Sequence, residues 1–157
     1  MLMAKIDPKD VQRLRAESGA GVMDCKRALE ETDGDYAKAL ALLKERGVQS
    51  VAKKSERAAK EGVIASYVHA NKRVGALVEL ASETDFVARS EDFQKLAQEI
   101  AMQVAAMEPA DVDDLLEQAY IRDASKTIRD LVTHLAASTG ENVQVRRFAR
   151  FKLGEAA

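Results

Sequence analysis

Apolar residues recur at helical spacing in three short segments near the N-terminus. The segments span about 8–18, 21–31 and 36–47. Asp7 precedes Pro8 as the N-cap of the first segment, and Asp35 is placed to cap the third. Glycines follow the first and end the third, as is typical of helix C-termini. The pattern therefore predicts a compact head of three helices, with the third helix ending at Gly47.

The pattern changes to that of strands beyond a basic stretch. Residues 48–61 carry lysines and an arginine among small residues, without a repeating apolar face, and predict a linker. Two strand-like runs follow over 62–70 and 73–81, and Asn71-Lys72 between them predicts a tight turn. Alternating apolar and polar residues over 142–153 predict a third strand that joins this hairpin.

Three further segments between the second and third strands have helical spacing. They cover 93–105, 112–119 and 128–136. Ser90 is placed to cap the first of them. Ser125 is the expected cap of the last, and Gly140 its expected end. The sequence thus predicts helices that cover a small antiparallel sheet.

Composition supports a helix-rich α+β protein in two parts. Hydrophobic residues make up 46% of the 157-residue chain, but aromatics only 4%, so Ala, Leu, Val and Ile must build the cores. This length suits either one ordinary domain or a small domain joined to a larger one. We expect a three-helix head over 1–47, a basic linker over 48–61 and an α+β core over 62–157.

Charge and reactive residues argue against several functions. The 24 basic and 26 acidic side chains give a net charge of -2, which does not favour a general polyanion binder. The single cysteine, Cys25, lies on the apolar side of its helix, and His69 and His134 are far apart. We find no paired base and nucleophile and no apolar run near the ~18 residues of a membrane span. The sequence predicts no enzyme, no metal site and no cofactor, and a reducing cytoplasm fits best.

Met23 lies off the apolar face of its predicted helix. On a helical wheel Val22 and Cys25 share the apolar face, whereas Met23 falls among charged residues and should point to solvent. A single exposed apolar residue is common on protein surfaces. A flexible methionine also suits contact with a partner protein. The pattern alone leaves both alternatives open.

Phe86 is the only large aromatic residue in the polar segment 82–92. Thr84 and Asp85 can cap a single helical turn around it. The ring either folds onto the sheet or stays exposed as a rigid anchor for a partner's pocket. The pattern alone does not choose between these alternatives.

The last predicted strand suggests a rival function in RNA binding. Basic and aromatic residues interleave there as Arg146, Arg147, Phe148, Arg150 and Phe151. However, Phe148 and Phe151 have opposite strand parity, so they should not form one stacking face unless a bulge intervenes. We expect no direct, specific binding of nucleic acid.

Two motifs carry a resemblance to a known family. The segment Ser82-Glu83-Thr84-Asp85-Phe86-Val87-Ala88 is similar to the Thr-Asp-Phe-Val signature of the elongation factor Ts family. Residues 18–29 resemble its first signature, a Gly-Ala-Gly turn opening a helix that carries Met, Asp-Cys-Lys and Ala-Leu. Segments 123–128 and 140–148 resemble the end of family members. In its length the chain resembles the short bacterial form of the family, and this resemblance implies a homodimer.

The resemblance implies a fold and a function. The head is expected to be UBA-like, and the chain to be a non-covalent guanine nucleotide exchange factor for elongation factor Tu. It would bind the GDP-bound partner, displace Mg2+ and GDP, and allow GTP to load. The implied partner-binding residues are Asp85, Phe86, Thr84, Val87, Met23, Val22 and Lys26.

Overall fold

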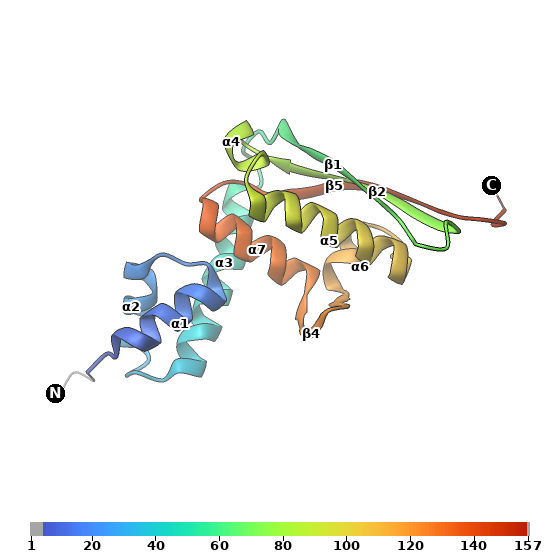
Figure 1. The fold of residues 1–157 in the computed structure, drawn as a ribbon. Coiled ribbons are helices and arrows are strands. Elements are labelled where there is room, and N and C mark those ends of the chain that lie inside the picture. Colours follow the sequence, from blue (N-terminus) through green and yellow to red (C-terminus); the bar gives the residue numbers. More distant parts are fainter. Residues whose placement is uncertain (1–4, 157) are drawn as a thin grey trace. The chain divides into compact units, whose positions relative to one another are not determined.

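The computed structural model describes residues 5–156 and divides into two compact units (Figure 1). The head unit contains Met1–Glu56 and Thr133–Glu141. The sheet unit contains Arg57–Val132 and Asn142–Ala157. The outermost residues of the expected head and core, 1–4 and 157, lie outside the described residues.

Three helices form the N-terminal part of the head unit. They are α1 (Pro8–Ser18), α2 (Val22–Glu31) and α3 (Tyr36–Lys54). The predicted caps are confirmed: Asp7 accepts from the Lys9 backbone N–H at 2.9 Å, and Asp35 accepts from that of Lys38 at 3.1 Å. The helices bury a common core of small and aliphatic residues. Its members are Leu14, Cys25, Ala28, Leu29, Ala39 and Leu43.

Helix α3 runs through Gly47 to Lys54, so the helix end predicted at Gly47 is wrong. A Cβ atom on Gly47 would lie 3.0 Å from the Thr133 side chain. The glycine therefore permits a close approach within the head unit instead of ending a helix. The first half of the expected linker is consequently helical, and only 55–60 lie between α3 and the first strand.

The end of α7 (Ile128–Thr139) also belongs to the head unit. His134 Nε2 lies 3.1 Å from the Ala16 carbonyl oxygen, and Gly19 faces the His134 backbone so closely that a Cβ would lie 2.6 Å from its oxygen. The predicted end at Gly140 is confirmed, since this residue has φ 73° and its N–H donates to Ala136. Helices α1 to α3 are thus joined by a fourth helical segment.

A three-stranded antiparallel sheet is the centre of the sheet unit. Its order is β1 (Glu61–Val68), β2 (Val74–Ser82) and β5 (Gln144–Lys152), which confirms the predicted hairpin and third strand. Lys72 adopts φ 59° in the turn, as predicted for a tight connection. At the other end of the hairpin a Cβ on Gly62 would lie 2.1 Å from the Leu80 carbonyl oxygen, so β1 needs a glycine there.

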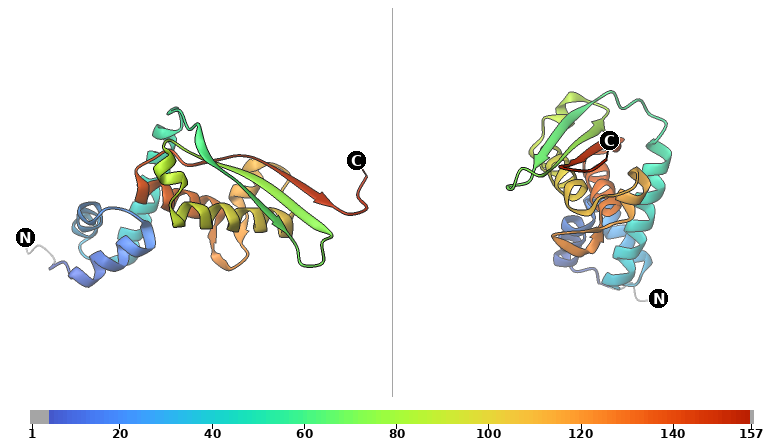
Figure 2. Two further views of the ribbon diagram at one scale, coloured as in Figure 1. Left: turned by 45° about the horizontal axis from the view of Figure 1, so that its top comes forward. Right: turned by 90° about the vertical axis from the view of Figure 1, so that its right-hand side faces the viewer.

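Helix α5 (Glu91–Met107) packs along one face of this sheet (Figure 2). Its predicted cap, Ser90, accepts from the Phe93 backbone N–H at 3.4 Å. The helix buries the residues predicted for its apolar face. They include Phe93, Leu96, Ala97, Ile100, Ala101 and Val104. The α+β class is confirmed.

The segment before α7 differs from the prediction. Helix α6 (Val112–Glu117) ends two residues before the predicted end, and a short hairpin follows, of β3 (Ala119–Tyr120) and β4 (Asp123–Thr127). Ser125 lies in β4, so its assignment as the helix cap is wrong. Thr127 takes that role: its hydroxyl accepts from the Asp130 N–H at 3.1 Å, while the Asp130 carboxylate accepts from the Thr127 N–H.

Candidate functional site

Phe86 projects from a single helical turn in the sheet unit. Helix α4 (Asp85–Ala88) begins after Thr84, whose side chain accepts from the Val87 backbone N–H at 3.4 Å. The predicted cap and turn are therefore confirmed. The Phe86 side chain is 85% exposed, so the alternative in which it folds onto the sheet is wrong.

Side chains on both sides of α4 hold this turn in place. Ser82, fully buried at the end of β2, donates to the Thr84 carbonyl oxygen at 2.9 Å. Beyond the turn, Ser90 donates to the Val87 carbonyl at 2.7 Å and Gln94 to that of Ala88 at 2.8 Å. These side-chain bonds add to the backbone bonds that the Thr84 and Val87 carbonyl groups already accept, and tie both ends of the turn to the residues around it. The exposed ring is thus carried by a fixed backbone.

Asp85 takes part in a surface ion pair on the same turn. Its carboxylate lies 3.2 Å from the Arg89 guanidinium, four residues along the chain. Both side chains are exposed, so the pair contributes little to stability. Asp85 is therefore accessible to a partner beside Phe86.

The other predicted contact residues lie together on α2 in the head unit. Met23 is 58% exposed, as predicted, and Lys26 is exposed as well. Val22 is 47% exposed, so its predicted place on the apolar face is wrong. It is the first residue of the helix, where the core formed by later turns does not cover it. Val22 and Lys26 are one turn apart and share an exposed surface.

Cys25 is buried in the head core, as predicted. Burial raises the pKa of its thiol, which keeps it in the less nucleophilic protonated form. Within residues 5–156 no group of three or more His, Cys, Asp or Glu side chains is arranged to hold a metal ion. No helix in that range is long and apolar enough to cross a membrane.

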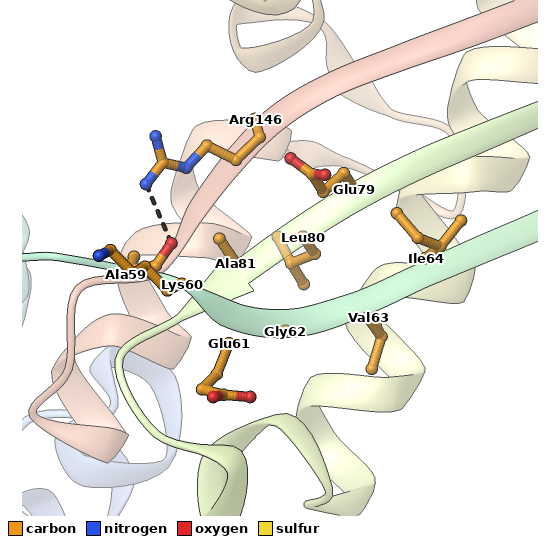
Figure 3. Close-up of a pocket in the computed structure, with 10 residues that line it drawn as sticks. All are labelled: Ala59, Lys60, Glu61, Gly62, Val63, Ile64, Glu79, Leu80, Ala81 and Arg146. Atoms are coloured by element: carbon orange, nitrogen blue, oxygen red, sulfur yellow. Dashed lines mark hydrogen bonds between the residues drawn. The ribbon is translucent and has the colours of Figure 1, made fainter.

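A shallow hollow of about 460 Å³ lies near the start of β1 (Figure 3). Backbone and aliphatic groups of β1 and β2 line much of it, and Arg146 reaches over one side and donates to the Ala59 carbonyl at 3.0 Å. Glu79 and Glu61 add acidic groups, and no histidine, cysteine or serine is among the lining residues. The hollow therefore has no constellation for nucleophilic catalysis.

Sequence reasoning missed the exposed apolar face of the sheet. The residues opposite α5 include four large exposed side chains: Ile64, Val68, Leu77 and Phe151. In the same row as Ile64, Glu79 and Arg147, paired across β2 and β5, lie 3.5 Å apart. One feature of the sequence does indicate this face: β1 carries apolar residues at both strand parities, which is unusual for a strand with one solvated face.

The last strand does not present one stacking face. Phe148 pairs with Val78 across the strands, and Phe151 pairs with Gly75. The two rings therefore lie on different faces of the sheet, as their parity predicted. The bulge in β5 falls between the partners of Glu79 and Leu80, away from both rings. Arg150 pairs with Glu108 and Glu155, each at 3.5 Å. The interleaved residues therefore do not form the platform that single-stranded RNA requires.

Comparison with known proteins gives consistent results. The family model described as "Elongation factor TS" matches residues 83–157, which include the Phe86 turn and the last strand. Elongation factor Ts of Anaeromyxobacter dehalogenans strain 2CP-1 is 44% identical over 198 residues, covering 98% of this chain and 90% of that protein. The chain belongs to the elongation factor Ts family. That of Oleidesulfovibrio alaskensis is 41% identical, covering 97% of this chain and 100% of that protein.

More distant members of the elongation factor Ts family match similarly. The Thermotoga neapolitana protein is 40% identical, covering 92% of this chain and 95% of its own length. The Anaeromyxobacter match spans 198 residues, against 157 in this chain, a difference of 41. That relative therefore has at least 41 residues within the matched span that have no counterpart here.

Proposed function

We propose that this protein is a guanine nucleotide exchange factor of translation elongation. It binds elongation factor Tu in the GDP-bound form, displaces Mg2+ and GDP, and allows GTP to load in the cytoplasm. The observation that carries this proposal is the 85% exposed Phe86 on a turn that is tied down on both sides. A rigid exposed aromatic ring is the usual anchor of a protein interface.

Two surfaces, one on each unit, make the contact in this proposal. The sheet unit supplies the Phe86 turn with its neighbours Thr84, Asp85 and Val87. The UBA-like head supplies the exposed start of α2, with Val22, Met23 and Lys26. Met23 and Phe86 contribute apolar area, while Asp85 and Lys26 can pair with charges on the partner.

The exchange must draw on more than the Phe86 ring. Burial of one phenylalanine supplies about 1.5–3 kcal/mol, or one to two decades of affinity. A tightly held nucleotide needs more than this. The binding energy of the whole interface is therefore coupled to loss of the ion that neutralises the phosphates. By linkage, nucleotide expels the factor as strongly as the factor expels nucleotide. No covalent step is required of this chain.

The working unit in this proposal is a homodimer formed through the exposed sheet face. Four large apolar side chains on that face, Ile64, Val68, Leu77 and Phe151, leave an area that a monomer rarely exposes. A two-fold interface needs a self-complementary surface, and the Glu79–Arg147 pair beside Ile64 supplies both charges on this face.

The exchange role of Phe86 is tested by Phe86→Ala. The side chain has few contacts within the chain, so the variant should keep its thermal stability but slow partner-bound GDP release by about tenfold. Stopped-flow fluorescence with labelled GDP on elongation factor Tu measures the rate. Met107→Ala is the control, because it also shortens an exposed apolar side chain, at the end of α5. Unchanged release by Phe86→Ala would exclude the proposed role.

A further inference from the structure

Glu83 connects the Phe86 turn to two distant parts of the sheet unit. It directly precedes the α4 cap Thr84, and its Oε1 accepts from the Asn142 backbone N–H at 2.7 Å. The same oxygen lies 3.5 Å from the Arg57 guanidinium. Asn142 is 59 residues away in sequence and comes just before β5. One carboxylate thus joins the end of β2, the segment before β1 and the entry to β5.

Asn142, whose backbone N–H donates to this carboxylate, is buried and held by its own side-chain hydrogen bonds. It is 1% exposed, and its side-chain Nδ2 donates to the Arg57 carbonyl oxygen at 2.9 Å. Its Oδ1 accepts from Gln144 at 3.0 Å. These bonds fix the backbone N–H of Asn142, which donates to the Glu83 carboxylate. Because the Glu83 side chain is only 24% exposed, water screens the charge-assisted bond less than it screens a surface pair.

We infer that Glu83 is a positioning residue for the Phe86 ring, through its bond to Asn142. The ring needs a fixed direction to act on a partner, and the backbone of Glu83 leads straight into the turn that carries it. The bonds of Ser82, Ser90 and Gln94 hold the carbonyl groups of the turn. The Glu83 bond instead anchors the chain where it enters the turn. This inference rests on the proposed exchange function.

A double-mutant cycle between Glu83 and Phe86 tests the inference. Glu83→Ala should slow GDP release at saturating factor by about tenfold, since it removes a charge-assisted bond and leaves the Asn142 N–H unpaired. In the Phe86→Ala background the same change should slow release by less than about twofold, because no ring remains to be positioned. A purely structural role would give equal effects in both backgrounds.

Two further variants keep this test decisive. Glu83→Gln retains an acceptor oxygen without the charge and should slow release by about threefold, with no effect once Phe86 is alanine. It also serves if Glu83→Ala fails to fold in thermal unfolding. Glu117→Ala is the matched control, because Glu117 also pairs between two elements, with Arg129 at 2.8 Å, and should leave release unchanged.

The outcomes separate this inference from the proposed function. The positioning role is wrong if Phe86→Ala slows GDP release but both Glu83 variants release GDP at the wild-type rate. It is also wrong if the effects of the Glu83 variants add fully to that of Phe86→Ala. In both cases the exchange role of Phe86 stands. If Phe86→Ala leaves release unchanged, both are wrong.

Discussion

At the scale of single residues, the hydroxyl of Tyr120 has a strongly raised pKa. This hydroxyl donates to Glu99 Oε2 at 2.5 Å, and that oxygen is 3.1 Å from Arg122 Nε. Burial and the bond to Glu99 raise the pKa of Tyr120 to about 12. The folded state therefore keeps the proton that an unfolded chain loses near pH 10. The stability from this group is complete below pH 10 and is lost as pH rises from 10 to 12.

Tyr120→Phe tests this ionisation. The variant should lose the tyrosine absorbance step near pH 12, and at pH 8 its free energy of unfolding in urea should fall by about 1 kcal/mol, because one hydrogen bond is gone. A step near 12 that survives Tyr120→Phe would show that another group titrates there.

Exposure of individual side chains was predicted unevenly. Met23 was placed correctly because its neighbours on α2 define the charged side of that helix. The side chain of Val22 was wrongly assigned to the apolar face, because a helical wheel treats the first turn as if the core extended to the end of the helix. The pattern of the sequence left the direction of Phe86 open, and only the family resemblance implied exposure, since the direction depends on Ser82 and Gln94, which bond to the turn from other elements.

At the scale of elements, local capping chemistry predicted most helix starts. Asp7, Asp35, Thr84 and Ser90 all accept a backbone N–H within three residues, so their sequence neighbours suffice to identify them. The two hairpin strands of the main sheet followed from strand-like runs around a tight turn, and the third strand followed from alternation.

Elements that depend on distant contacts were not predicted. Gly47 stays helical where it lies against Thr133, which comes 86 positions later in the chain. The β3–β4 hairpin depends on the fully buried Gln103 of α5, which accepts from the Ile121 N–H at 3.0 Å and donates to the Ala119 carbonyl. Neither relation is visible in a local pattern, so a helix end and a short hairpin were missed.

At the scale of the whole molecule, the exposed sheet face predicts self-association. A lysine at Leu77 would place a charge in the middle of the proposed two-fold interface, so Leu77→Lys should convert a dimer to a monomer. Light scattering at micromolar concentration measures the mass. Val48→Lys is the control, since Val48 and Leu77 are both 49% exposed but Val48 lies on α3. A wild-type monomer would contradict the proposed dimer.

Stimulated release of GDP from elongation factor Tu by the intact chain is the direct test of the proposed exchange function. Saturating protein should accelerate release of labelled GDP in stopped flow by about tenfold or more, and higher free Mg2+ should reduce this acceleration, because the ion and the factor oppose each other through linkage. A release rate that saturating protein leaves unchanged at every Mg2+ concentration would contradict the proposed exchange function.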